Sequence, residues 1–363
     1  MRKLMVVVGT RPNFIKVTRI KAVAAERGDW QVRLVHTGQH FDERMSTVFF
    51  DQFGLVPDHW LEIPKGSPNT QMAHIMLGLE ELIGKDRPDL MMVAGDVNST
   101  LAAALTANKM GVPLAHLESG LRSRDMGMPE EINRILTDRI TDIFLVTERS
   151  GKENLIREGV AEERIHFTGN TMIDTLVAFE DRIRTSPILD ELGLGNGGHV
   201  LMTIHRPATV DDKEQLHQLV RLVEEVAGKH PVVFPVHPRT MGNLERFGLH
   251  DKLVSLKGVT LSGPMDYFAF QKLIATCAFV ITDSGGIQEE TTYRQVPCLT
   301  VRPNTERPIT ITEGTNELIT FDLKALRAAI ARIDLGTFKK GRIPHLWDGH
   351  ATERVFEALE RAL

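Results

Sequence analysis

Short apolar runs alternate with longer amphipathic segments along almost the whole chain. Nearly continuous apolar runs of four or five residues are typical of strands that are buried on both faces of a parallel sheet. Six such runs lie in the first half and at least five in the second, at 4–8, 32–36, 90–94, 113–117, 143–147 and 165–168, then at 200–204, 232–236, 259–262, 279–282 and 298–301. Segments with helical periodicity lie between most of them, for example 71–83, 99–109, 132–141, 213–229 and 267–276. This strand–helix rhythm predicts an α/β protein with two doubly wound parallel sheets.

The two blocks of strands are separated by a break between residues 180 and 198. Ser186-Pro187 and the glycine-rich stretch 193–198 interrupt the pattern there. We therefore expect an N-terminal Rossmann-type domain over 1–180 and a C-terminal Rossmann-type domain over 199–350. The last segment, 351–363, has apolar residues at helical spacing, and we expect it to form a helix that joins the first domain.

Composition excludes several classes of protein. The 363 residues are 42% hydrophobic and 25% charged with a formal net charge of -5, which indicates two soluble domains without a basic field for nucleic acid. Cys277 and Cys298 stand in apolar runs, which favours buried free thiols in a reducing compartment. No apolar stretch approaches the ~18 residues of a membrane helix, and the first apolar run is too short for a signal peptide. We expect a cytoplasmic protein with no membrane partner.

Polar residues follow the predicted strands directly. Ligands of doubly wound sheets bind outside the carboxyl ends of the strands, so these positions are candidate binding residues. They are Gly9-Thr10-Arg11-Pro12, His36-Thr37-Gly38-Gln39-His40, Gly95-Asp96, Glu118-Ser119-Gly120-Leu121-Arg122, His205-Arg206, His237-Pro238-Arg239 and Asp283-Ser284-Gly285-Gly286. We expect a ligand at this edge of both sheets.

Two of these turns have the composition of phosphate sites. Ser284, Gly285 and Gly286 precede a helix, whose free N–H groups and dipole favour an anion, and Glu290 one turn later is placed to accept ribose hydroxyls. The alternative is a simple N-capped turn with Ser284 as the cap. Arg11 and Lys16 bring two cations to the other predicted helix N-terminus, a conflict that a bound diphosphate would remove. Alternatively, both are solvated surface charges.

Candidate catalytic groups are three carboxylates and a histidine pair. Clustered carboxylates such as Asp96, Glu118 and Glu130 can supply both an acid and a base, because neighbouring charges separate their pKa values. Structural alternatives exist for each: Asp96 as an N-cap near Ser99, Glu130 as a first-turn acid, and Glu118 as the partner of Arg122. His205 and His237 follow strands in the second block, beside Arg206 and Arg239. Arg307, in a loop after Glu306, suits either an anion or a surface salt bridge.

In this order, the motifs resemble those of the non-hydrolysing UDP-N-acetylglucosamine 2-epimerases. Besides the turns above, the resemblance rests on His116–Arg122, Pro129-Glu130-Glu131-Ile132-Asn133-Arg134, Thr168-Gly169-Asn170-Thr171, Pro235-Val236-His237, Thr282–Glu290, Thr305-Glu306-Arg307-Pro308 and Glu313-Gly314-Thr315. It runs from residue 4 to about 350. The segments 13–14 and 207–210 depart from the family pattern and leave the identity of the sugar open.

The resemblance implies a GT-B-like fold of two Rossmann-type domains with the active site in the cleft between them, and a homodimer. It implies interconversion of UDP-GlcNAc and UDP-ManNAc without a cofactor or metal, by elimination of UDP to 2-acetamidoglucal and re-addition. The matching positions give catalytic roles to Asp96, Glu118, Glu130 and His205, and substrate contacts to Arg11, Lys16, Arg134, His237, Phe270, Ser284, Gly285, Gly286, Glu290 and Arg307.

Four alternatives remain open at this point. The chain could epimerise a related UDP-N-acetylated sugar, act as a hydrolysing 2-epimerase that releases ManNAc, or be a GT-B glycosyltransferase. From another class, it could be a UDP-sugar sensor without activity.

Overall fold

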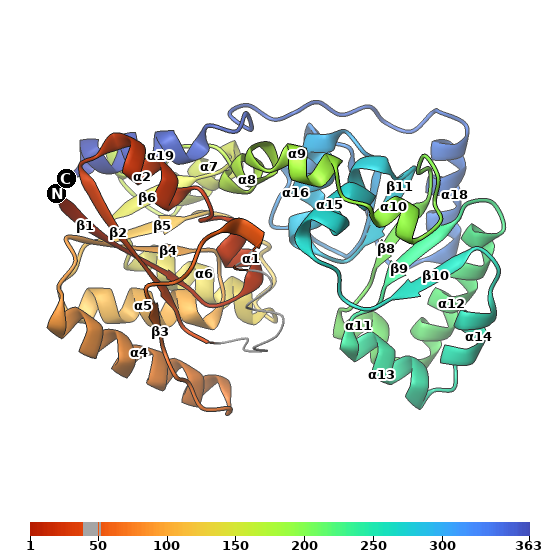
Figure 1. The fold of residues 1–363 in the computed structure, drawn as a ribbon, viewed down its shortest axis with the longest axis horizontal. Coiled ribbons are helices and arrows are strands. Elements are labelled where there is room, and N and C mark those ends of the chain that lie inside the picture. The colour runs from red at the N-terminus through yellow and green to blue at the C-terminus, as the bar shows by residue number, and fades with distance from the viewer. Residues whose placement is uncertain (39–49, 51) are drawn as a thin grey trace. The chain divides into compact units, whose positions relative to one another are not determined.

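The computed structural model describes residues 1–38, 50 and 52–363, so Gln39 and His40 of the second predicted turn lie outside the described residues. The chain divides into two compact units (Figure 1). Unit 1 comprises Met1–Ala178 and His345–Leu363, and unit 2 comprises Phe179–Pro344. Each unit is one parallel sheet covered by helices.

Unit 1 contains a sheet of seven parallel strands in the order β3-β2-β1-β4-β5-β6-β7. The strands are β1 (Arg2–Val8), β2 (Trp30–His36), β3 (His59–Trp60), β4 (Leu90–Ala94), β5 (Leu114–Leu117), β6 (Ile143–Val146) and β7 (Ile165–Phe167). All six predicted strands are confirmed, and the two-residue edge strand β3 is added. The order reverses at β1, whose Val6 lies between Leu34 of β2 and Met92 of β4.

Helices alternate with these strands along the chain and cover the sheet (Figure 1). They are α1 (Arg11–Ile15), α2 (Ile20–Arg27), α4 (Pro68–Lys85), α5 (Asn98–Lys109), α6 (Pro129–Arg139), α7 (Arg149–Arg157), α8 (Thr171–Ala178) and α19 (Ala351–Ala362), with a 3-10 turn at Glu162–Arg164. Met91 and Met92 of β4 are fully buried, on opposite faces of the sheet. The alanines at 102–104 and 107 let α5 approach β4 closely, where larger side chains would not fit.

The C-terminal segment is fastened to unit 1 by buried polar contacts. Asp174 of α8 accepts the backbone N–H groups of Ala351 (3.0 Å) and Thr352 (2.6 Å), and therefore caps α19 from another helix. The indole N–H of Trp347 donates to the carbonyl of Thr147 over 3.1 Å. Phe356 of α19 packs edge-on against Trp30, with 5.6 Å between ring centroids.

Unit 2 contains six parallel strands in the order β10-β9-β8-β11-β12-β13. They are β8 (Val200–Thr203), β9 (Val232–Pro235), β10 (Val259–Ser262), β11 (Phe279–Thr282), β12 (Cys298–Val301) and β13 (Asn316–Ile319). The helices are α9 (Glu180–Arg184), α10 (Ile188–Glu191), α11 (Pro207–Val210), α12 (Lys213–Ala227), α13 (Pro238–Arg246), α14 (His250–Ser255), α15 (Tyr267–Thr276), α16 (Gly285–Arg294), α17 (Ile309–Thr312) and α18 (Leu323–Asp334). All five predicted strands are confirmed, and β13 is added at an edge.

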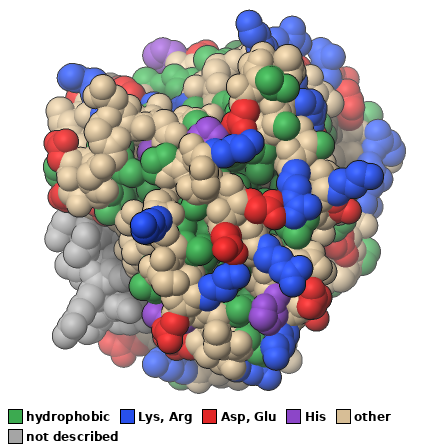
Figure 2. All heavy atoms as spheres, turned by 90° about the vertical axis from the view of Figure 1, so that its right-hand side faces the viewer, with side chains coloured by type: hydrophobic (Ala, Val, Ile, Leu, Met, Phe, Trp, Pro, Cys, Tyr) green, Lys and Arg blue, Asp and Glu red, His purple; other side chains and the backbone are tan. Residues whose placement is uncertain are grey.

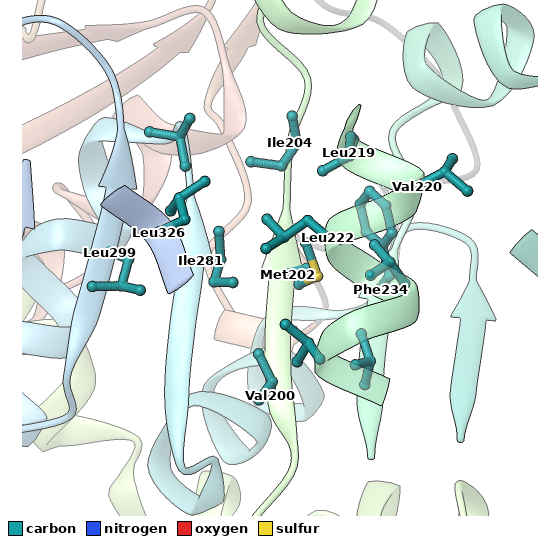
Figure 3. Close-up of a cluster of buried hydrophobic side chains, with 14 of the residues drawn as sticks. Val200, Met202, Ile204, Leu219, Val220, Leu222, Phe234, Ile281, Leu299 and Leu326 are labelled. Carbon is teal, nitrogen blue, oxygen red and sulfur yellow. The ribbon is translucent and has the colours of Figure 1, made fainter. Parts of the chain in front are cut away.

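The core of unit 2 lies between β8, its neighbours and α12. Met202 and Phe234 point from the sheet toward Leu219 and Leu222 of the helix, and all four are at most 1% exposed (Figure 3). Removing such side chains from water stabilises the fold by about 1.5–3 kcal/mol each. This packing holds the carboxyl ends of β8, β9 and β11 in fixed positions.

Cys277 and Cys298 are free thiols, and burial raises the pKa of Cys298 to about 11.

Acidic and basic side chains are interspersed on the face of the molecule that Figure 2 shows. Among the described residues, no helix is both long and apolar enough to cross a membrane.

Candidate functional site

The turn after β1 is fastened to the end of β4. A Cβ on Gly9 would lie 2.1 Å from the hydroxyl oxygen of Ser99, so only glycine fits there. Thr10 donates to the side-chain oxygen of Asn13 (2.7 Å), and the Asn13 amide donates to the carbonyl of Ala94 (2.8 Å). Asn13, a departure from the family pattern, therefore joins two of the predicted ligand turns.

Lys16 lies at the C-terminal end of helix α1, not at its N-terminal end as predicted. Helix α1 has five residues, and Lys16 caps its C-terminal end, where the helix dipole favours a cation. Its ammonium forms an ion pair with the carboxylate of Glu118, and the two side chains are 6% and 3% exposed. The predicted conflict with the helix dipole is thus wrong for Lys16. Arg11, at the first position of α1, is half-buried.

Glu118 lies directly after β5 in a constrained backbone conformation. Its φ of 68° is in the left-handed region, which costs a residue with a side chain about 1–3 kcal/mol. A Cβ on Gly95 would lie 2.9 Å from the Asn13 amide nitrogen and 3.5 Å from a carboxylate oxygen of Glu118. The Glu118 carboxylate is therefore packed beside Gly95, the residue before Asp96.

Asp96 is held by α6. Its carboxylate forms an ion pair with Arg134, which also binds Glu131, and Arg134 is buried. The Asn133 amide donates to the Asp96 carbonyl over 2.9 Å. The alternative that Asp96 caps α5 is wrong, because Val97 is the capping residue. The Asp96 side chain stays 27% exposed, so part of its carboxylate faces solvent.

Glu130 and Glu131 begin α6 but lie in different environments. Glu130 is exposed. Glu131 is 1% exposed and accepts the backbone N–H groups of Ser123 (2.9 Å) and Arg124 (2.8 Å). In this structure the buried acid of the pair is Glu131, which the sequence did not single out.

A chain of polar contacts that runs from His116 to Glu158 was also missed. His116 lies between Asp138 and the carbonyl of Gly95, and Asp138 also binds Arg122, which in turn binds Glu158. The alternative that Arg122 pairs with Glu118 is therefore not how these side chains are arranged. The sequence feature that could have indicated this network is His116, a polar residue inside an otherwise apolar strand.

In unit 2, Asp283 organises the turn after β8. Its fully buried carboxylate accepts the backbone N–H groups of His205 (2.8 Å) and Arg206 (2.7 Å), and lies 2.8 Å from the His205 Nδ1. The His205 side chain is 40% exposed. Because Nδ1 faces Asp283, Nε2 is the ring nitrogen that can meet a ligand. Asp283 was in the predicted turn but was not named as a site residue.

His237 lies next to His205, with 5.4 Å between ring centroids. Its Nδ1 accepts the backbone N–H of Arg239 at the start of α13, over 3.2 Å. Partial burial and the neighbouring His205 lower the pKa of His237. Both predicted histidines are thus brought together at the carboxyl edge of the sheet.

The turn between β11 and α16 brings four predicted residues together. Ser284 occupies the N-cap position, as the capped-turn alternative expects, but its side chain makes no capping hydrogen bond. A Cβ on Gly285 would lie 2.7 Å from a Glu306 oxygen and 3.0 Å from an Arg307 nitrogen. Arg307 is buried and forms ion pairs with Glu306 and Glu289, the latter at 2.7 Å, so it is not part of a surface salt bridge. Gly286 is the second residue of α16.

Glu290 and Phe270 lie on neighbouring helices, α16 and α15. Burial raises the pKa of Glu290 to about 7. Phe270 is half-buried against an apolar cluster of unit 2. No group of three or more His, Cys, Asp or Glu side chains within 1–38, 50 and 52–363 is arranged to hold a metal ion.

Comparison with known proteins shows the family. Residues 22–360 match the sequence model described as UDP-N-acetylglucosamine 2-epimerase. A protein of that name from Methanocaldococcus jannaschii is 36% identical, over 98% of both chains. The UDP-2,3-diacetamido-2,3-dideoxy-D-glucuronate 2-epimerase of Pseudomonas aeruginosa is 39% identical, over 99% of both chains.

Solved structures agree. The crystal structure of the Methanocaldococcus jannaschii UDP-GlcNAc 2-epimerase in complex with UDP-GlcNAc and UDP has a TM-score of 0.89 at 35% identity, covering 99% of both chains. The UDP-GlcNAc-bound enzyme of Neisseria meningitidis has a TM-score of 0.89 at 26% identity, covering 99% of this chain and 100% of that one. The predicted GT-B-like pair of Rossmann-type domains is confirmed as the fold class. The chain belongs to the UDP-N-acetylglucosamine 2-epimerase family.

Proposed function

We propose that this protein interconverts UDP-GlcNAc and UDP-ManNAc by eliminating UDP across C1–C2 and adding it back with the configuration at C2 inverted. The observation that supports this best is the pair of carboxylates at the ends of adjacent strands. Asp96 follows β4, Glu118 follows β5, and the Glu118 carboxylate packs beside Gly95. An elimination at C2 and its reversal on the other face need two such groups.

The chemistry balances without an external redox partner. The C1–O bond breaks and its electrons leave with UDP, while a carboxylate accepts the proton from C2, which gives 2-acetamidoglucal. Re-addition returns a proton to C2 from the opposite face and re-forms the C1–O bond. Positive charge at C1 makes the C2 proton removable, so stabilising the departing diphosphate drives the first step.

The residues of unit 2 are suited to hold UDP. The N-terminus of α16, with Ser284 and Gly285, offers backbone N–H groups to the diphosphate. His205, held by Asp283, has one ring nitrogen facing solvent and is proposed to act on the same leaving group. Glu290 is the proposed acceptor for the ribose hydroxyls, and Phe270 the proposed contact of the uracil.

In unit 1, Asp96, Glu118 and Glu130 are the proposed catalytic carboxylates, with Arg11 as a further substrate contact. For Arg134 and Lys16, which the resemblance gives as substrate contacts, we propose a different role. Each forms an ion pair with a catalytic carboxylate, so we propose that they orient Asp96 and Glu118. We also propose that the protein acts in the cytoplasm as a homodimer.

Turnover of UDP-GlcNAc in D₂O, followed by proton NMR, tests the proposal. We expect deuterium at C2 and a mixture of the two epimers, with no net release of free sugar. Active enzyme without deuterium at C2 would refute it. Free ManNAc would indicate a hydrolysing enzyme, and turnover only with an added acceptor a glycosyltransferase. Asp96→Asn is expected to abolish turnover while calorimetry still detects UDP binding. Binding without turnover in the wild type would indicate a sensor.

A second substrate is supported by the 39% identical relative, which acts on a diacetamido uronate sugar. The same NMR assay with UDP-2,3-diacetamido-2,3-dideoxyglucuronate separates the two. A larger kcat/KM for that sugar than for UDP-GlcNAc would change the assigned substrate and leave the reaction class unchanged.

A further inference from the structure

The hydrogen bonds around His116 determine its charge. Its Nδ1 lies 2.7 Å from a carboxylate oxygen of Asp138, and its Nε2 lies 2.8 Å from the carbonyl oxygen of Gly95. A carbonyl only accepts hydrogen bonds, and so does an ionised carboxylate. Both ring nitrogens of His116 must therefore donate, which a neutral imidazole cannot do.

The surroundings of Asp138 keep it ionised and thus unable to donate. Its other oxygen accepts the backbone N–H of Gly120 (3.0 Å) and lies 2.7 Å from the Arg122 guanidinium. Burial alone raises the pKa of Asp138, but its contacts with His116 and Arg122 outweigh burial and lower it. Glu158 binds the far side of Arg122 in two hydrogen bonds of 2.9 and 2.7 Å, so the four charges alternate in sign.

His116 and Asp138 each form a hydrogen bond with the backbone close to one of the proposed catalytic carboxylates. His116 holds the carbonyl of Gly95, the residue before Asp96, and Asp138 holds the N–H of Gly120, two residues after Glu118. Between them, Glu118 has a φ of 68°, which in a residue with a side chain needs support from its surroundings. His116 is fully buried and Asp138 is 2% exposed, so neither can contact a substrate.

We propose that His116 is a buried imidazolium and, with Asp138, a positioning pair that holds the turns bearing Asp96 and Glu118 in their reactive geometry. The catalytic part of this inference rests on the function proposed above, whereas the charge state does not. A displacement of about 1 Å in a reacting group can cost a hundredfold in rate, so the pair matters without touching the substrate.

The charge state is tested on the wild-type protein by ¹⁵N NMR with labelled histidine at pH 7.5, where the His116 signals are those lost in His116→Gln. We expect both ring nitrogens to carry protons. Asp138→Asn keeps the shape and offers an amide donor to Nδ1, so His116 should become neutral and donate only to Gly95. A neutral ring in the wild type, or an unchanged charged ring in Asp138→Asn, would overturn the proposal.

Kinetics test the positioning role. Asp138→Asn is expected to lower kcat for the UDP-sugar at least tenfold and to change KM less than twofold, because most of the proposed substrate-binding contacts lie in unit 2. His74→Gln, on the exposed side of α4, is the control and should keep wild-type kinetics. An unchanged kcat in Asp138→Asn would refute positioning. If wild-type protein turns over no UDP-sugar, the proposed function fails, and the NMR result still decides the charge of His116.

Discussion

Replacing Lys16 by Met tests whether the buried ion pair with Glu118 holds unit 1 together. The two side chains are only 6% and 3% exposed, so the variant leaves a carboxylate in the interior without its ammonium partner. Removing one partner of a buried ion pair costs about 3–5 kcal/mol, because the remaining charge was already taken out of water. Lys16→Met should lose about that much of the free energy of unfolding of unit 1.

The same residue type provides a matched control in the same unit. Lys21 forms an ion pair with Asp58 at 2.8 Å, but the side chains are 30% and 34% exposed. Water screens such a pair, so Lys21→Met should cost less than about 1 kcal/mol. The difference in unfolding free energy between the two variants measures the effect of burying the ion pair, since both remove the same lysine side chain.

Tryptophan fluorescence during urea unfolding reports on unit 1 alone. The chain has three tryptophans, Trp30, Trp60 and Trp347, and all belong to that unit. With a urea dependence of about 2–3 kcal/mol/M, the unfolding midpoint of Lys16→Met should fall by about 1–2.5 M. Lys16→Met/Glu118→Gln, which removes both charges, should recover much of the loss. A midpoint equal to that of Lys21→Met would refute the reasoning.

Three further predictions concern single contacts. Asp174→Ala removes the acceptor for two backbone N–H groups of α19 and should destabilise unit 1 by about 1–3 kcal/mol in the same fluorescence assay, whereas a loss below 0.5 kcal/mol would contradict the remote cap. Because burial raises the pKa of Glu290 to about 7, its carboxylate forms in the folded protein only at higher pH. UDP affinity measured by calorimetry should therefore rise from pH 6 to pH 8 more steeply in the wild type than in Glu290→Gln, and equal slopes would exclude Glu290 from binding. Gly285→Ala places a methyl group 2.7 Å from Glu306 and should weaken UDP binding at least tenfold, whereas Gly263→Ala, in open space, should bind normally.

The central strands could be predicted from the sequence because both faces of each are buried. β4 is apolar at all five positions, so its pattern is unmistakable. The two strands that were missed are edge strands. β3 has two residues, and β13 begins with Asn316 and Glu317, so neither gives a continuous apolar run. Helix α6 was predicted to begin at Ile132 but begins at Pro129, a residue that suits the first helical turn.

The candidate turns could also be predicted, because the ligand edge follows from the direction of parallel strands. The partners of each side chain could not. Lys16 and Glu118 are 102 residues apart, and their contact depends on the order of β1, β4 and β5 in the sheet. The contact of His116 with Asp138 depends on which face of α6 is turned toward β5. Neither sheet order nor helix rotation can be read from local spacing.

Exposure separates the side chains that can meet a substrate from those that hold them. In unit 2, His205 is 40% exposed and its partner Asp283 is fully buried. In unit 1, Asp96 is 27% exposed and its partner Arg134 is 3% exposed. Glu118 does not follow this division, because it is proposed to react and yet is 3% exposed behind Lys16. Of these two paired carboxylates, Asp96 is therefore the one whose side chain reaches solvent in this structure, whereas Glu118 is held against Lys16. The Lys16→Met variant bears on this point too, because it removes the group that keeps Glu118 in place.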